Sequence, residues 1–269
     1  MLLEDIATLS DGVEVALDVL QMHLYCNPEQ TRNRNERLVS VGRDLLVRAN
    51  FGKNSTLPDY GIDTVILLCL SGDEGRRTAE KVCNNICSAL DAYHVSPHNL
   101  GNIFKALLET QPSITLDVFL LSPSPHGIRH RFDLDFDIGP SLENVDPAIL
   151  HAWAGRDPEA RYPLLGQCLR MFRSEKNEEQ NEISPLFLSM LNHAPDKRLF
   201  LGDLSDRVHP RSWGGSLAHI LIRRKAQVMK LAEHSDAQVR ALASDLTSEL
   251  DRWIELERGR DRESEESFE

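Results

Sequence analysis

The sequence lacks an excess of positive charge and has no long hydrophobic run. It holds 30 lysine and arginine residues against 42 aspartate and glutamate residues, which gives a formal net charge of -12 at pH 7. Such an acidic chain is not drawn as a whole to nucleic acid or to an anionic membrane, although it can still carry a local basic face. The longest strongly apolar run, VILLCL at 65–70, is far too short to span a bilayer.

The N-terminus also lacks the features of a signal peptide. The segment MLLEDIATLS has neither a positively charged start nor a continuous apolar stretch. The five cysteines are odd in number and lie mostly within apolar helical patterns, which favours free thiols in a reducing compartment over a disulfide framework. We therefore expect a soluble, cytoplasmic protein with no membrane partner.

Strand-like alternation is scarce as well, and most segments have the period of an α-helix. Helix starts are marked by a capping residue followed by proline at Asp146-Pro147, Asp157-Pro158 and Ser184-Pro185. Apolar residues recur at intervals of three and four, which places them on one face of a helix. The sequence therefore predicts an all-α protein of short helices, with apolar stripes such as Val13, Ala16, Leu17, Leu20 and Leu24, and Leu100, Ile103, Phe104, Leu107 and Leu108.

Candidate starts of a second helix recur along the chain at intervals of 38, 39, 45, 39 and 40 residues. A period of about 40 residues is typical of a repeat made of two helices. One helix is expected before each start, at 11–25, 61–70, 97–110, 147–154, 185–193 and 216–233. The six predicted starts are Asn35, Asp73, Pro112, Asp157, Asp196 and Asp236.

Two of these starts carry the same pair of charged residues. Asp157 precedes Arg161 in RDPEARYPLL, and Asp236 precedes Arg240 in SDAQVRALAS. The aspartate can accept backbone N–H bonds at the helix start, and the arginine one turn later can reach a neighbouring carboxylate. In stacked repeats such pairs would form a ladder.

These residues resemble HEAT and armadillo-type helical repeats, whose second helix commonly opens with an aspartate followed by a pair such as Val-Arg and a run of small residues. The resemblance is clearest in residues 146–256, and it implies an α-solenoid of antiparallel helix pairs. We expect an N-terminal helical region at 1–121, an insertion loop at 122–145 with one short strand, the HEAT-like repeats at 146–256, and a disordered charged tail at 257–269.

The stretch HPRSWGGSLAHILIRRK, residues 209–225, lacks the lysine and strand of a phosphate-binding loop and the G-x-S-x-G pattern of a serine nucleophile. Gly214 and Gly215 are therefore predicted to form a corner before a helix that Ser216 caps. Tryptophan and arginine are enriched at binding hot spots. The candidate partner-binding residues are Trp213, Arg223, Arg224 and Lys225.

Two groups of possible metal ligands depart from known patterns. DLDFDIG at 133–139 has the alternating carboxylates of a calcium loop, but Ile138 precedes the glycine and Asn144 stands where a bidentate glutamate is needed. The set Cys83, Cys87, His94 and His98 has ligand types that suit zinc, but its cysteines lie on a core stripe and its loop is too short for a finger. We predict no metal site, no cofactor and no catalytic pair.

The expected function is a non-catalytic interaction module or scaffold that binds a protein or peptide on a solenoid surface. Because the first expected helix begins almost at Met1, a further hypothesis is that the chain is the C-terminal region of a larger protein.

Two alternatives stay open. One is a nucleic-acid-binding protein similar to HEAT-like DNA glycosylases, which the net charge disfavours, with Trp213, Arg223 and Arg224 on one concave face. The other is a metal-dependent enzyme that uses the 126–137 loop, with the ligands His126, His130, Asp133, Asp135 and Asp137.

Overall fold

The protein is helical throughout most of the chain. The computed structural model describes residues 2–9, 12–26, 35–52, 62–131, 138–172, 182–202, 208–210 and 214–266. Among these residues the single β-type pairing is an isolated bridge between Phe172 and Ile183. The prediction of an all-α fold is therefore confirmed for this part of the chain. None of the described helices combines the length and apolar composition that crossing a membrane requires.

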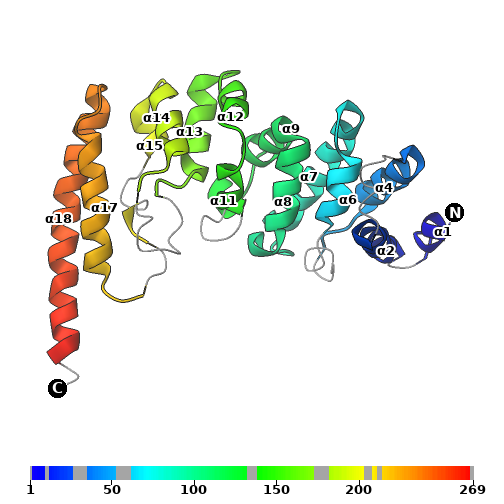
Figure 1. Cartoon of the computed structure of the whole chain (residues 1–269), viewed down its shortest axis with the longest axis horizontal. Helices are drawn as coiled ribbons and strands as arrows, with labels where there is room; N and C mark the ends of the chain where they lie inside the picture. Colours follow the sequence, from blue (N-terminus) through cyan, green and yellow to red (C-terminus); the bar gives the residue numbers. More distant parts are fainter. Residues whose placement is uncertain are drawn as a thin grey trace. The chain divides into compact units, whose positions relative to one another are not determined.

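The chain divides into two compact units, Met1–Trp153 and Ala154–Glu269. The division falls inside a helix that was predicted at 147–154, so it lies beyond the expected boundary at 122–145. The first unit holds α1 (Leu2–Ile6), α2 (Gly12–Cys26), α4 (Glu36–Arg48), α6 (Asp63–Cys69), α7 (Arg76–Asp91), α8 (Gly101–Thr110), α9 (Pro112–Leu116), α10 (Ile128–Arg131), α11 (Ile138–Glu143) and most of α12 (Pro147–Ala154), shown in Figure 1.

Helix starts in the first unit agree with the capping residues in the sequence. The Asn35 side chain accepts the N–H groups of Arg37 and Leu38 at 3.1 and 3.3 Å, and Pro112 is the first residue of α9. Asp73 opens a 3-10 turn, Asp73–Gly75, that leads directly into α7. The Asn35 side chain satisfies N–H groups of the first turn of α4, and the fixed φ of Pro112 suits the first position of α9.

Apolar stripes pack the helices of this unit together. Helix α2 contacts α4 and α6, α4 also contacts α7, and α6 contacts α8. Ala16, Leu17, Leu20 and Leu24, on the buried face of α2, are at most 1% exposed. Burying each leucine contributes about 1.5–3 kcal/mol, and this contribution lets helices of one or two turns persist.

The predicted insertion loop is in part helical and belongs to the first unit. Within 122–145, α10 contacts α7 and α11 contacts α8. The strand expected in this segment falls at 132–137, outside the described residues. The proline- and glycine-rich pattern marked the turn at 122–127 but did not reveal that the flanking residues fold back onto α7 and α8.

The second unit contains five described helices: α13 (Pro158–Cys168), α14 (Pro185–His193), α15 (Lys197–Leu201), α17 (Leu217–Leu231) and α18 (Ala237–Glu266). Helix α13 contacts α14 and α15, and α15 also contacts α18. The predicted caps at Asp157, Ser184 and Asp196 each accept a backbone N–H of the helix that follows.

Helices α17 and α18 form a long antiparallel hairpin. Buried residues recur on α17 at alternating intervals of four and three, as in a coiled-coil seam. The Ser216 hydroxyl at the start of α17 donates a hydrogen bond of 2.6 Å to Asp261 near the end of α18. The seam consists of Leu217, Leu221, Arg224, Val228 and Leu231 from α17 and Val239, Ala243, Leu246, Leu250 and Ile254 from α18.

The prediction of a disordered tail at 257–269 is wrong for residues 257–266, which continue α18. Two ion pairs, each between residues one turn apart, support this extension of α18. Arg258 pairs with Glu255 at 2.8 Å, and Arg260 pairs with Glu257 at 2.5 Å. A highly charged segment can form a helix when its opposite charges are three or four residues apart. The opposite charges of this segment have that spacing.

Two glycines of the second unit should respond in opposite ways to alanine. A β-carbon on Gly166 of α13 would lie 2.2 Å from the backbone oxygen of Phe200, whereas one on Gly259 of α18 would meet no atom within 4 Å. Gly166→Ala should therefore lower the free energy of unfolding by about 1–3 kcal/mol. Gly259→Ala should raise it by about 0.5–1 kcal/mol, because glycine is a poor helix former. Urea unfolding measures both, and equal effects would contradict the close approach of α13 and α15.

Candidate functional site

The predicted corner before α17 is present, but the residues around it do not form one surface. Gly215 adopts a left-handed φ of 75°, and the Ser216 hydroxyl accepts the N–H of His219 at 3.3 Å. Trp213, one of the candidate partner-binding residues, lies outside the described residues. The three basic candidates that follow on α17 point in different directions.

Arg224 is a buried structural residue. Its side chain is 2% exposed, its guanidinium donates a hydrogen bond of 2.8 Å to the carbonyl of Val208, and it lies 4.8 Å from the centre of the Phe172 ring. The expectation that Arg224 meets a partner is therefore corrected. It occupies a position in the apolar seam of α17, and the three-and-four spacing of that seam was the signal in the sequence.

The other two basic residues remain near the surface. Arg223 is exposed, and Lys225 makes an ion pair with Asp251 of α18. Lys225 thus joins the two helices of the hairpin. The stretch 223–225 therefore offers a partner one exposed arginine instead of a continuous basic patch.

Three of the predicted ladder residues, Asp157, Asp236 and Arg240, make hydrogen bonds close to themselves in the chain. Asp157 accepts the N–H of Ala160 at 3.4 Å, and Asp236 accepts the N–H of Gln238 at 2.8 Å. That bond to Gln238 is the main cause that holds the pKa of Asp236 below its usual value. Arg240 donates to the carbonyls of His234 and Ser235, both at 2.7 Å. Each aspartate is thus a helix cap, and Arg240 satisfies carbonyls just before its own helix.

Arg161 belongs to the same predicted set. It follows Asp157 by one turn in α13 and is half-buried. No contact between these two pairs is described, so the ladder stays a prediction.

A buried ion pair fastens the segment after α9 to the end of α7. Arg131 is 2% exposed on its side chain and meets both carboxylate oxygens of Asp91, at 2.6 and 3.1 Å. The same guanidinium donates to the carbonyls of Phe119, Ser122 and Pro123. We call this arrangement the Asp91–Arg131 clasp.

The clasp also involves Ser124 and His126. The Ser124 hydroxyl donates to Asp91 at 2.7 Å, and a ring nitrogen of His126 lies 3.2 Å from the Asp91 carbonyl. Serine, histidine and aspartate are thus close together, but the serine donates to the aspartate and not to the histidine. A nucleophilic triad needs a hydrogen bond between the serine hydroxyl and the histidine ring, and the described contacts include no such bond.

Partial burial alone would raise the pKa of Asp91. The hydrogen bonds from Arg131 and Ser124 and the charge of Arg131 outweigh burial and hold the pKa of this carboxyl below its usual range. The carboxylate form is therefore the one that the fold stabilises.

The metal-enzyme alternative falls largely outside the described residues. Asp133, Asp135 and Asp137 belong to 132–137, and the side chain of His130 is not described either. His126 is directed to the clasp, where its ring also packs on Tyr93 with centroids 4.6 Å apart. Within the described part of the chain, no group of three His, Cys, Asp or Glu residues is placed to hold a metal ion.

The cysteines of the possible zinc set lie in the core of the first unit. Cys83 and Cys87 are buried on α7, as the stripe pattern predicted, and His94 is exposed beyond the end of that helix. Burial raises the pKa of Cys87 to about 12 and that of Cys83 further. The side chain of His98 is not described.

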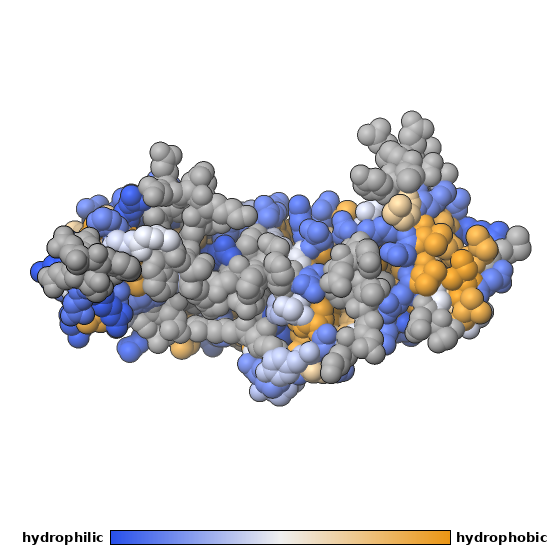
Figure 2. Space-filling view, turned by 90° about the horizontal axis from the view of Figure 1, so that it is seen from below, coloured by the Kyte–Doolittle hydropathy of each residue, from blue (hydrophilic) through white to orange (hydrophobic). Residues whose placement is uncertain are grey.

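One surface that the sequence analysis missed is apolar and exposed. Of the ten exposed large hydrophobic residues in the described part of the chain, five lie in the first 22 residues, on or next to α1 and α2. Figure 2 shows a broad hydrophobic area where these helices lie. We call it the N-terminal apolar surface, which consists of Leu2, Leu9, Val15, Val19 and Met22.

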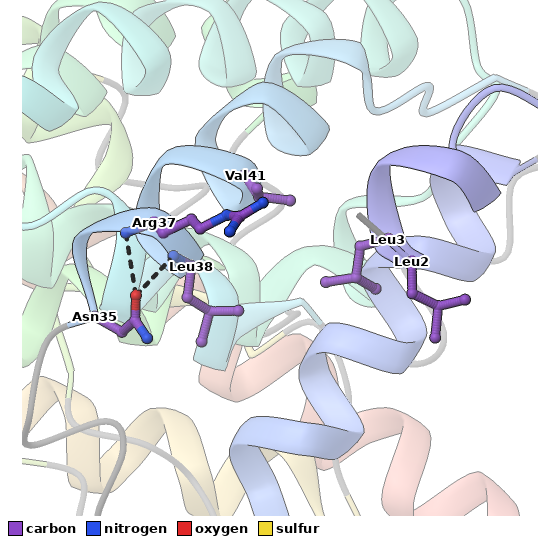
Figure 3. A pocket seen from close by; sticks show the side chains of 6 residues that line it. All are labelled: Leu2, Leu3, Asn35, Arg37, Leu38 and Val41. Atoms are coloured by element: carbon purple, nitrogen blue, oxygen red, sulfur yellow. Dashed lines mark hydrogen bonds between the residues drawn. The ribbon is translucent and has the colours of Figure 1, made fainter.

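A shallow pocket adjoins this surface between α1 and α4. Its volume is about 220 Å³, and Figure 3 shows Leu3 of α1 and Leu38 of α4 on its opposite sides. Sites that enclose a drug-sized ligand measure about 300–1,000 Å³. The pocket is therefore of a size to receive a single side chain. Its full lining is Leu2, Leu3, Asn35, Arg37, Leu38 and Val41.

The N-terminal segment is strongly acidic. Residues 1–31 contain six aspartate and glutamate residues and no lysine or arginine, so they contribute -6 of the chain's formal charge of -12. Among the described residues, α4 brings basic side chains to this segment: Arg37 lines the pocket, and Arg48 donates to the carbonyl of Ala7 at 2.5 Å. The described residues of α1 and α2 themselves thus carry acidic side chains and no lysine or arginine.

Compared with protein-family models, curated proteins and solved structures, the chain gives no significant match.

The neighbouring arginines of α17 provide a test of the corrected assignment. Arg224→Ala should lower the free energy of unfolding by about 3 kcal/mol, because it removes packing on Phe172 and leaves the Val208 carbonyl without its donor. Arg223→Ala should change it by less than about 0.5 kcal/mol, as is usual on a surface. Chemical denaturation monitored by circular dichroism measures both. Equally small effects of Arg224→Ala and Arg223→Ala would contradict the burial of Arg224.

The Asp91–Arg131 clasp should make stability depend on pH. Because the pKa of Asp91 is lowered by folding, its contribution is complete above the ordinary carboxyl pKa of about 3.9 and is lost as the pH falls through the lowered value. Asp91→Asn should cost about 3 kcal/mol at neutral pH, because Arg131 stays buried without its counter-charge, and should reduce the loss of stability in acid.

The control for this variant is Asp44→Asn, which breaks an exposed ion pair with Arg48. Its effect on stability at neutral pH should stay below about 0.5 kcal/mol. Thermal melts of both variants against pH measure the difference. An Asp91→Asn protein with the acid sensitivity of wild type would show that the clasp does not carry this dependence.

Proposed function

We propose that this chain is a non-catalytic interaction module that binds a protein or peptide segment. The observation that carries the proposal is the N-terminal apolar surface. Val15, Val19 and Met22 are 52%, 42% and 61% exposed, although they lie in a well-formed helix whose opposite face is fully buried. Contiguous exposed apolar patches mark interaction sites, whereas single exposed apolar residues are ordinary on a protein surface.

The order of the helices along the chain supports the proposal that this module is a scaffold built from helical repeats. We propose that successive helix pairs, such as α2 with α4, are units of a HEAT-like solenoid. In the first unit α2 and α4 both contact α6, and α4 contacts α7, so neighbouring pairs share a buried core. Such arrays expose extended surfaces, and a pair at the edge of an array has one side without a neighbouring repeat.

The alternatives have less support from the described residues. A nucleic-acid site would use Arg223 and Arg224 together, but Arg224 is buried. A metal-dependent site would need ligands in 132–137. Neither group supplies an observation comparable with the exposed hydrophobic residues of α1 and α2, so we propose neither function.

The proposal predicts that capture of a partner depends on the apolar surface. The purified chain should retain a specific protein from nuclease-treated native lysate, and Val19→Asp should abolish that retention because a charge then faces the apolar partner surface. Met229→Asp in the second unit is the matched control, because Met229 is similarly exposed at 53% and the charge change is the same. Quantitative mass spectrometry of the three pull-downs gives the readout.

Retention of the same proteins by wild type and Val19→Asp would refute a role for this surface. Capture that disappears after nuclease treatment would instead support nucleic acid as the ligand. Circular dichroism of each variant establishes that the fold is intact before the comparison.

A further inference from the structure

The exposed apolar residues of α2 lie in one line. Val15, Val19 and Met22 are spaced by four and three residues, so they occupy adjacent turns on one face of the helix. They lie opposite the buried face formed by Ala16, Leu17, Leu20 and Leu24. We call these three exposed residues the α2 stripe. Anchors at this spacing are the pattern by which one helix packs against another.

Acidic residues accompany the stripe along one edge. Asp18 is exposed, and Glu14 lies one turn before it on the same side of α2, next to the line of Val15 and Val19. The opposite edge carries His23. The short helix α1 adds Asp5 and Glu4, both exposed, although the carboxyl of Glu4 lies near the positive charges of the chain's N-terminus and of Arg37. The described residues of α1 and α2 contain no lysine or arginine, so the formal side-chain charges that these two helices place beside the stripe are negative.

We propose that the α2 stripe binds an amphipathic helix with basic residues beside its apolar face. This inference rests on the proposed function and names the class of partner. Apolar side chains of the partner would cover Val15, Val19 and Met22, and its lysine or arginine residues would lie next to Asp18 and Glu14. Complementary charges at the edge of an apolar contact select the partner and speed its association.

The same charges disfavour a second copy of this chain as the occupant. Two α2 stripes packed against each other would bring Asp18 and Glu14 of one chain near those of the other, with no basic residue from α1 or α2 to offset them. Like charges brought together at an interface oppose binding. The acidic edge likewise opposes attachment to an anionic membrane surface.

A pair of synthetic peptides tests the proposal on the full chain. One is an amphipathic helix of about 18 residues, or five turns, built from leucine, alanine and lysine; the other has glutamate in place of every lysine. The lysine peptide should bind with a Kd near 10 μM, and the glutamate peptide at least about tenfold more weakly. Fluorescence anisotropy of labelled peptides measures both.

Three variants separate docking from general attraction to an acidic protein. Val19→Asp makes the surface more acidic, so general attraction would strengthen, whereas docking on the stripe should weaken about tenfold or more. Met229→Asp should bind as wild type does. The double variant Glu14→Lys, Asp18→Lys keeps the stripe, and it should bind the glutamate peptide more tightly than the lysine peptide.

Each other result overturns the inference. Equal binding of both peptides, no binding of either, or tighter binding of the lysine peptide by Val19→Asp would each refute a site for a basic helix. Dimerisation of the wild type that Val19→Asp abolishes, seen by sedimentation, would assign the stripe to a second copy. The pull-down above decides the proposed function separately, because a captured partner without a basic helix would overturn only the choice of partner.

Discussion

Each helix of this protein depends on burying its apolar stripe against a neighbouring helix. Most of the described helices span fewer than 16 residues, and isolated helices of that length are marginal in water. Contacts such as those of α2 with α4 and α6 therefore supply the stability that the single helices lack. The second apolar face of α2 is an exception, because Val15, Val19 and Met22 stay exposed.

Many short helices also mean many helix ends, and each end leaves backbone carbonyls without an intrahelical partner. Long side chains fill this need at several places. Gln111 donates to the carbonyls of Leu70 and Gly72 at 2.6 and 2.7 Å, and buried Lys197 donates to those of Asn192 and Ala194 at 2.9 and 2.5 Å. Arg131, Arg224 and Arg240 do the same elsewhere. Arg224, which the sequence suggested as part of a binding patch, thus stabilises the fold instead.

Features that depend on a few consecutive residues could be predicted from the sequence. Asp157 and Asp236 cap helices where the sequence placed them, because a cap involves only its own first turn. Features that depend on which helix lies beside which could not. The spacing on α17 places Arg224 on the apolar face of that helix, but its contacts with Phe172 and Val208, which are distant in sequence, do not follow from that spacing. The exposure of Val19 likewise depends on the absence of a covering helix among the described residues. Composition alone also could not distinguish a charged tail from a charged helix.

The four described cysteines, Cys69, Cys83, Cys87 and Cys168, are all buried, and they are distributed over both units. Only the thiolate form reacts rapidly with alkylating or oxidising reagents, and burial of Cys83 and Cys87 suppresses that form. A reagent can therefore modify these two thiols only when α7 separates from its neighbours. Cys83 and Cys87 are therefore chemical reporters whose rate of labelling records how often the first unit opens.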